Sequence, residues 1–303
     1  MAGAATIDAA LLLDKPVGIS SNRALQDVKN LYKARKAGHA GTLDPLASGL
    51  LLVLFGEATK FAGPLLDADK EYVTTVKLGE KTATGDAEGE IIERSAFQVS
   101  EAAIPDALKK FEGSIEQVPP MYSALKRDGV PLYELARRGE SVEREARRVQ
   151  ISLVEKIRFE APLLELRIRC SKGTYIRTLG EDIAAALGSV GHVTALRRTA
   201  SGVFQVSDAV GLEALQGMEE TERRGRLLPL TALLAGLPRA ELDAAAETRF
   251  RNGQALAFDG VQGLCGVYGR GGVVGLGRAE AGQLHPVRLT AAQGALAATQ
   301  DAE

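Results

Sequence analysis

Residues 38–49 read Gly38-His39-Ala40-Gly41-Thr42-Leu43-Asp44-Pro45-Leu46-Ala47-Ser48-Gly49, and this stretch decides how the chain is interpreted. Glycines let a backbone approach a ligand closely, so the carboxylate of Asp44, displayed between Gly41 and Gly49, suits a nucleophile or a general base. A structural interpretation is also open. Asp-Pro is a common turn or helix-start pair, in which the aspartate caps and the proline takes the first helical position.

The residues on both sides of this loop predict strands and a helix. The apolar run 50–54, directly after the loop, is typical of a buried strand. Further strands are expected at residues 11–14 and 72–78. A turn at residues 15–18 follows the first of these, and the side-chain oxygens at residues 20–22 can cap a helix whose apolar residues then recur at helical spacing.

A second strand–helix unit carries a candidate partner for Asp44. Residues 164–170 alternate strictly between apolar and polar, as a half-buried strand does. The following helix has an apolar stripe at residues 176, 179, 183 and 187, and Gly188 is expected to end it. Arg177 opens this helix. An arginine beside an aspartate lowers the carboxyl pKa and can hold it in a bidentate pair, although an ordinary surface arginine is the alternative.

Positive charge is concentrated in the middle of the chain. The net charge is −2, yet residues 121–200 hold 15 Lys and Arg against 10 Asp and Glu, which leaves +5. Prolines and glycines interrupt residues 119–148, where seven of these basic residues lie, so we expect an exposed, partly helical insertion there. Such a region suits contact with nucleic acid, and a solvated surface of mixed charge explains it equally well.

Composition and missing motifs exclude several classes of protein. With 303 residues, 45% of them hydrophobic and 25% charged, the chain has the balance of a globular protein. Its apolar runs are far shorter than the roughly 20 residues of a membrane span. Two cysteines without a CxxC motif argue against a disulfide scaffold or a zinc site. No phosphate loop, dinucleotide fingerprint or serine-hydrolase elbow is present. We expect a reduced, cytoplasmic protein without a metal.

The C-terminal part changes character after a linker expected at residues 227–238. Short strands are expected at 254–258, 263–268 and 273–277, with a hairpin turn at 269–272. They indicate a β-rich appendage of about 60 residues. Strands mixed with helices, without regular alternation, favour an α+β architecture. The acidic, alanine-rich stretch 241–247 does not favour phosphate contact.

The quoted loop resembles the active-site loop of the TruB family, the bacterial tRNA pseudouridine synthases that act on uridine 55 of the T-loop. Further matches follow in family order over about residues 11–205: Leu13-Asp14-Lys15-Pro16, Gly56-Glu57-Ala58-Thr59-Lys60, Lys70-Glu71-Tyr72, Val118-Pro119-Pro120-Met121-Tyr122-Ser123-Ala124, Cys170-Ser171-Lys172-Gly173-Thr174-Tyr175-Ile176-Arg177-Thr178 and His192-Val193-Thr194-Ala195-Leu196-Arg197-Arg198. The resemblance implies an α+β pseudouridine-synthase fold, with a mixed, largely antiparallel central sheet flanked by helices. It implies a catalytic domain over residues 1–237, with a thumb inserted at about 119–148, and a small β-rich, PUA-like domain over 238–303. A purely structural β cap is the alternative for this last part.

The resemblance also implies roles for nine residues. Asp44 matches the catalytic aspartate, Tyr72 the active-site tyrosine implicated in removing the proton from C5, and Arg177 the arginine that pairs with the aspartate. The remaining six are expected to bind the RNA, to line the pocket or, for the lysine, to support the loop: His39, Tyr175, Leu196, Lys15, Arg147 and Arg148.

The implied reaction flips uridine 55 out of the T-loop, detaches uracil from ribose and rejoins it through carbon 5. The bond made replaces the bond broken, so no redox cofactor, ATP or metal is required. The aspartate attacks C1′ or removes the C2′ proton, and both routes stay open. The expected partner is the T-arm of tRNA, with no membrane, and the protein is expected to be a monomer. A tRNA-binding folding chaperone with secondary or no isomerase activity is the alternative, whereas a glycosidase lacks a second acid near Asp44.

Overall fold

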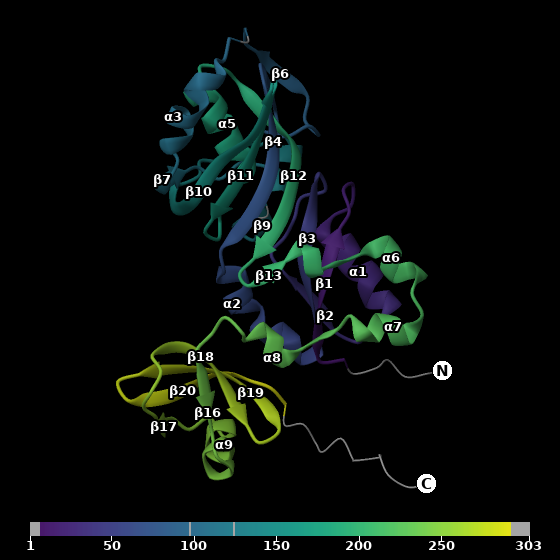
Figure 1. The fold of residues 1–303 in the computed structure, drawn as a ribbon, viewed down its shortest axis with the longest axis vertical. Coiled ribbons are helices and arrows are strands. Elements are labelled where there is room, and N and C mark those ends of the chain that lie inside the picture. The colour runs from purple at the N-terminus through teal and green to yellow at the C-terminus, as the bar shows by residue number, and fades with distance from the viewer. Residues whose placement is uncertain (1–6, 97, 124, 292–303) are drawn as a thin grey trace.

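The body of the molecule is one mixed sheet of eleven strands, seen in the computed structural model that describes residues 7–96, 98–123 and 125–291 (Figure 1). Eight strands cross it in the order β14 (Val210–Gly211), β1 (Ala9–Lys15), β3 (Ala47–Phe55), β12 (Gly191–Ser201), β4 (Lys70–Leu78), β11 (Leu163–Cys170), β10 (Arg147–Glu160) and β7 (Gly113–Gln117). Three shorter strands pair beside this path, namely β2 (Ala37–Ala40) with β3, β13 (Phe204–Gln205) with β12 and β15 (Leu228–Pro229) with β1. The β1–β14 and β3–β12 pairs are parallel, and the remaining pairs are antiparallel.

Short helices and hairpins flank the sheet. The α-helices of the body are α1 (Ser21–Leu31), α2 (Ala62–Asp67), α3 (Ile104–Lys109), α4 (Leu132–Arg137), α5 (Ile176–Ala186), α6 (Leu212–Gly217), α7 (Glu220–Gly225) and α8 (Leu230–Leu233). Short 3₁₀ segments are η1 (Gly56–Phe61), η2 (Glu101–Ala103) and η3 (Val206–Asp208). Two small hairpins pair β5 (Glu80–Thr82) with β6 (Ile91–Arg94), and β8 (Lys126–Arg127) with β9 (Val130–Pro131).

The elements predicted from residue patterns are present. The expected strands at 11–14, 50–54, 72–78 and 164–170 lie within β1, β3, β4 and β11. Helix α1 begins after Ser20, whose side chain accepts a hydrogen bond from the backbone N–H of Arg23, as an N-cap residue does. Helix α5 ends at Ala186, two residues before Gly188, whose φ of +73° belongs to the left-handed region that favours glycine.

Separate apolar clusters hold the sheet to its flanking helices. On one half of the sheet, Leu166 and Val76 pack with Leu179 and Ile183 of α5, and all four side chains are buried. On the other half, side chains of α1 pack on Leu51 and Val53 of β3. Burying apolar surface is the main term that stabilises such a fold. Strand β3, buried at all but one residue, therefore gives the 41–46 loop in front of it a rigid base.

A second, five-stranded sheet forms the C-terminal part, below the body in Figure 1. Its order is β16 (Arg239–Glu241), β18 (Gly263–Gly269), β19 (Gly272–Glu280), β20 (Gln283–Leu289) and β17 (Leu256–Ala257), and α9 (Ala244–Arg251) packs beside it. The hairpin turn expected at 269–272 joins β18 to β19. Strands β16 and β20 were not anticipated, because β16 is only three residues long and β20 contains Pro286.

The segment expected to be a free linker is not one. Residues 227–238 contain β15, which pairs with β1, and α8, whose Leu230 and Leu233 are buried. These leucines share one apolar cluster with Leu52 of β3 and with Tyr268 and Leu276 of the C-terminal sheet. The segment therefore joins the C-terminal sheet to the body through a common core, and its leucines are explained by this packing.

The basic insertion lies between β7 and β10. It contains the β8–β9 hairpin and α4, so the expected partly helical character is present. Arg147 and Arg148, however, are the first residues of β10 and pair with Gln117 and Glu116 of β7. Both arginines therefore lie where the insertion returns to the sheet, on the strand next to the edge strand β7. Ala124 of the 118–124 motif, and residues 1–6 and 292–303 of the two expected domains, lie outside the described residues.

Candidate active site

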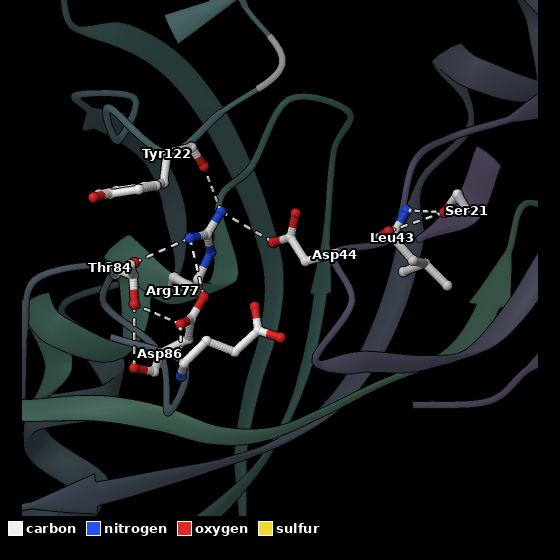
Figure 2. Close-up of polar contacts among 8 residues, drawn as sticks. Ser21, Leu43, Asp44, Thr84, Asp86, Tyr122 and Arg177 are labelled. Carbon is white, nitrogen blue, oxygen red and sulfur yellow. Dashed lines mark hydrogen bonds and ion pairs between the residues drawn. The ribbon is translucent and has the colours of Figure 1, made fainter. Parts of the chain in front are cut away.

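The loop that carries Asp44 connects β2 to β3 and is fixed from behind by α1. The Ser21 hydroxyl accepts a hydrogen bond from the backbone N–H of Leu43 at 2.7 Å and donates to its carbonyl at 2.9 Å (Figure 2). The backbone N–H of Gly18 donates to the Pro45 carbonyl at 2.8 Å, and that of Ala47 to the Asp44 carbonyl at 3.0 Å. Contacts on both sides of Asp44 thus hold its backbone in one position.

Asp44 faces Arg177, as Figure 2 shows. Oδ2 of Asp44 lies 3.0 Å from Nη2 of Arg177, so the expected ion pair between these residues is present. Arg177 opens α5, and its side chain is only 6% exposed. The same guanidinium donates to the carbonyls of Tyr122 at 2.6 Å and Thr84 at 3.0 Å. These contacts orient the guanidinium independently of Asp44.

A second carboxylate, Asp86, holds Arg177 from the opposite side. Its Oδ2 lies 3.1 Å from Nη1 of Arg177, and its side chain is 3% exposed. Oδ1 of Asp86 accepts hydrogen bonds from the Thr84 hydroxyl at 2.5 Å and the backbone N–H of Glu88 at 3.1 Å. Arg177 therefore lies between two carboxylates, one enclosed and one facing a pocket.

Asp44 and Arg177 line a pocket of about 270 Å³. This is close to the lower end of small-molecule sites, roughly 300–1,000 Å³, and suits one nucleoside better than a longer segment. Three expected residues, Tyr72, Tyr175 and Leu196, line the same pocket. The other lining residues are Gly41, Thr42, Leu43, Leu66, Lys70, Ser123, Ser171, Lys172, Gly173, Thr174, Ile176 and Arg198.

The surroundings of the pocket shift the pKa values of Asp44 and Tyr72. The Asp44 side chain is 41% exposed, but that surface faces the concave pocket. Burial raises the pKa of Asp44, Arg177 beside it lowers the pKa, and the nearby charge of Asp86 raises it again. Burial raises the pKa of Tyr72, which Arg198 opposes. Perturbed groups gathered in one cleft are typical of a catalytic site.

Lys15 supports the loop from behind and does not face the pocket. It is fully buried, and its ammonium donates to the carbonyls of Pro16 at 2.8 Å and Ile19 at 2.7 Å. Burial lowers the pKa of Lys15 to about 8, while Asp44 raises it. Its burial and these contacts agree with the expectation that Lys15 supports the loop.

His39 and the two arginines also lie away from the pocket lining. His39 is half-buried on β2, opposite Val53, and its buried Nδ1 has no hydrogen-bond partner among the described residues. Burial and the charge of Arg198 lower the pKa of His39. Arg147 and Arg148 are exposed at the start of β10, beyond the pocket-lining residues.

Sequence reasoning missed three residues that shape the site. Asp86 lies in the turn after β5, Gln117 ends β7 and Lys70 begins β4. Gln117 accepts from the backbone N–H of Tyr175 at 2.7 Å and donates to its carbonyl at 3.1 Å, which fixes the start of α5. Lys70 donates to the carbonyls at the end of α2, and burial lowers its pKa to about 8. Only the Lys70-Glu71-Tyr72 match gave a signal for any of them. Across the described side chains, no three His, Cys, Asp or Glu gather as a metal site requires.

Comparison with known sequences assigns the chain to a family. Residues 29–176 match the N-terminal domain of TruB family pseudouridylate synthases, and residues 177–235 and 238–290 match two C-terminal domains of tRNA pseudouridylate synthase B. The tRNA pseudouridine synthase B of Burkholderia mallei (strain NCTC 10247) is 51% identical over 292 residues, which cover 93% of this chain and 97% of that protein. The chain belongs to the TruB family. The synthase of Azoarcus sp. (strain BH72), which has the same name, is also 51% identical, over 95% of this chain and 96% of that protein.

Solved structures agree with this assignment. A chain in the crystal structure of a Cbf5-Nop10-Gar1 complex is 29% identical, with a TM-score of 0.71 over 89% of this chain and 78% of that one. A chain of an H/ACA RNP bound to a substrate RNA containing 2′-deoxyuridine is 27% identical, with a TM-score of 0.68 and the same coverage. The expected α+β pseudouridine-synthase fold with a small β-rich C-terminal domain is therefore confirmed, and this TruB family member is an isomerase. The C-terminal domain is a curled β half-barrel. No helix within the described ranges has the length and apolar character to cross a bilayer.

Proposed function

We propose that this chain isomerises uridine 55 in the T-loop of tRNA to pseudouridine, with Asp44 as the catalytic residue. The observation that carries the proposal is the Asp44–Arg177 ion pair, 3.0 Å long, in a pocket that Tyr72 also lines. Relatives at 51% identity that are named tRNA pseudouridine synthase B support the choice of substrate. The observed carboxylate, guanidinium and phenol are the groups that the reaction requires.

Asp44 starts the reaction at the ribose. Either the carboxylate attacks C1′, or it removes the C2′ proton and a glycal forms; in both routes the bond between N1 and C1′ breaks. The freed uracil turns so that C5 faces C1′, and a new C5–C1′ bond forms. As it forms, Asp44 leaves C1′ in the first route, or returns the proton to C2′ in the second. The proton on C5 is then removed through Tyr72, and N1, which has lost its bond to C1′, takes up a proton from solvent. Atoms and electrons balance without a redox partner, because one glycosidic bond replaces another.

Arg177 keeps Asp44 ionised and aimed at the sugar. Burial disfavours the charged carboxylate, and the adjacent guanidinium offsets this effect on the pKa of Asp44. Asp86 and the Thr84 and Tyr122 carbonyls already hold the guanidinium in place. A donor that needs no reorganisation during the reaction stabilises developing charge most effectively. Of the residues that the structure describes, none donates to Oδ1 of Asp44, which leaves that oxygen available to the substrate.

The pocket walls receive a flipped base. Extracting a uridine from a folded loop costs a few kcal/mol. Packing against Tyr72, Tyr175 and Leu196 offsets this cost, since one stacked base contributes about 1–3 kcal/mol. The pocket volume admits one nucleoside, which requires the target to leave its stack. Tyr72 is thereby placed against the base while Asp44 faces the ribose.

The basic insertion and the start of β10 contact the T-arm in this proposal. Arg147 and Arg148 are exposed beside it, and arginines bind phosphates through a planar, bidentate fork. We assign residues 1–237 to the catalytic domain, with its insertion at about 119–148, and residues 238–303 to a PUA-like domain. A-form RNA is recognised mainly by shape and phosphate contacts, so exposed arginines outside the pocket suit this substrate. A monomer is sufficient for such a complex.

The proposal is tested by mapping pseudouridine on an unmodified tRNA transcript after incubation with the purified chain. A transcript with cytidine at position 55 is the matched control. We expect one new pseudouridine, at position 55, in the first transcript only. Modification at another position would overturn the choice of target. Binding of both transcripts without modification would favour the folding chaperone instead.

A further inference from the structure

A buried arginine that the proposed reaction does not use lies at the floor of the pocket. Arg198 is on β12, where its register partners are Tyr72 on β4 and Gly49 on β3. It is 1% exposed and is among the largest fully buried side chains of the described chain. Directly opposed residues on neighbouring strands project from the same face of a sheet. Arg198 and Tyr72 are therefore side by side, and both line the pocket.

Arg198 joins the two ends of the catalytic loop. Its Nε donates to the carbonyl of Leu50 at 2.7 Å, and its Nη2 donates to the carbonyl of Gly41 at 3.1 Å. Gly41 precedes Asp44 by three residues, and Leu50 follows the loop as part of β3. One planar guanidinium thus connects the beginning of the loop to the strand at its end. The separation of these ends determines where Asp44 is held.

The two glycines that bound the loop also fit closely against Arg198. A Cβ atom on Gly49 would lie 2.3 Å from the Arg198 carbonyl oxygen, and one on Gly41 would lie 3.1 Å from Nη1. Both glycines have positive φ values, +100° and +90°, which residues with a side chain rarely adopt. Gly41 thus leaves room for the Arg198 guanidinium, whereas Gly49 leaves room for the backbone of β12 at residue 198.

The charge of Arg198 lacks a carboxylate partner among the described residues. Its charged neighbours are mostly other bases, and its charge lowers the pKa values of Lys15, Lys70 and His39. Burying an uncompensated charge is costly, and an apolar side chain would fill the same space at lower cost. Anchoring of the loop alone does not account for an arginine at this buried position. The positive charge itself therefore has a role.

The phenol of Tyr72 is the group that the charge of Arg198 acts on. Burial raises the pKa of Tyr72, whereas the charge of Arg198, its register partner on β12, lowers the pKa. The Cys170 thiol on β11 and the Asp44 carboxylate on the loop act in the opposite direction to Arg198. Arg198 is thus the positive group that favours the phenolate form of Tyr72.

We propose that Arg198 is a positioning residue, which holds the ends of the Asp44 loop together and presents a positive charge to the Tyr72 hydroxyl. The inference rests on the roles proposed above for Asp44 and Tyr72. A positive charge beside the phenol favours the phenolate, which takes the C5 proton to become a neutral phenol and then passes that proton to solvent. Loop geometry and proton transfer are thereby linked through one side chain.

The test compares Arg198→Met with Arg167→Met, which removes an exposed arginine of β11 that pairs with Glu155 at the surface. Each protein is labelled with 3-fluorotyrosine, and Tyr72→Phe assigns the Tyr72 signal in ¹⁹F NMR. We expect the Tyr72 titration midpoint to move to higher pH in Arg198→Met only. Turnover should fall by about 10-fold or more, part of the roughly 10²–10⁴ that positioned proton transfer supplies, while tRNA affinity changes less than about twofold.

An unchanged titration midpoint with unchanged turnover in folded Arg198→Met would overturn the proposal. If this variant does not fold, Arg198→Lys is used, because one ammonium cannot reach the Leu50 and Gly41 carbonyls and the phenol together; wild-type turnover in Arg198→Lys would also overturn it. Full turnover in Tyr72→Phe would instead remove Tyr72 from the proposed function. The ¹⁹F titration would still decide whether Arg198 acts on the phenol.

Discussion

Replacing Asp86 with asparagine tests what each of the two carboxylates that pair with Arg177 contributes. Asp86 is the enclosed member, 3.1 Å from Nη1 of Arg177 and 2% exposed as a residue. Asparagine keeps the shape of the side chain and can still accept the hydrogen bonds from the Thr84 hydroxyl and the Glu88 N–H. The substitution therefore removes the charge and leaves the local turn intact.

The expected cost follows from this geometry. Removing one partner of a buried ion pair destabilises a protein by about 3–5 kcal/mol, because the other charge stays buried and uncompensated. Asp44 still pairs with Arg177, and asparagine keeps the neutral hydrogen bonds, so we expect the lower end, about 3 kcal/mol. Urea unfolding at neutral pH measures this loss. Asp106→Asn, at an exposed pair with Lys109, should change the free energy of unfolding by less than about 1 kcal/mol.

The same substitution should also shift the pH dependence of turnover. The negative charge of Asp86 raises the pKa of Asp44, so its removal lowers that pKa. If turnover requires ionised Asp44, the acidic limb of the kcat–pH profile moves to lower pH in Asp86→Asn. An acidic limb that moves to higher pH, or a loss of stability no larger than that of Asp106→Asn, would refute the reasoning about the shared arginine.

Three further predictions concern the loop, the ion pair and the RNA contact. Arg177→Lys should reduce single-turnover rates by about 10²-fold or more, since one ammonium cannot serve both carboxylates; a rate within a factor of three of wild type would contradict it. Alanine at both Arg147 and Arg148 should weaken tRNA binding and reduce the slope of log Kd against log salt by about 1–2, whereas an unchanged slope would remove them from the phosphate contact. Gly49→Ala should abolish turnover or folding, because its Cβ would lie 2.3 Å from the Arg198 carbonyl oxygen; a folded, active variant would be incompatible with that packing.

Local patterns were sufficient for much of the fold. The apolar run after the catalytic loop and the alternation in residues 164–170 follow directly from burial on two faces or on one face of a sheet. The leucines of α8 could be misread as part of a linker, because a four-residue helix has too few turns to show a periodic pattern. Its packing between two sheets depends on partners far away in sequence.

A site residue could be predicted from the sequence only where a reactive side chain lies in a recognisable local setting, such as a loop between glycines or the start of a helix. Asp44 between glycines and Arg177 at the start of a helix carry such signals. Asp86 has no signal of this kind, because its importance arises from a contact with an arginine 91 residues later. Arg198 likewise acquires its position from the register of β12 against β3 and β4. Strand register and long-range ion pairs are set by the whole fold, which a short motif does not contain.

Release of tritium from tRNA labelled at C5 of uridine, compared between wild type and Asp44→Asn, tests the central claim most directly. Burial raises the pKa of Asp44 in the folded chain above its value in the unfolded chain, so ionised Asp44 lowers the free energy of unfolding at neutral pH. Asparagine is neutral in both states, and we therefore expect Asp44→Asn to be no less stable than wild type at that pH. We predict that Asp44→Asn binds tRNA as tightly as wild type and releases no tritium above background. Release by the folded variant at a rate within tenfold of wild type would contradict the catalytic role of Asp44.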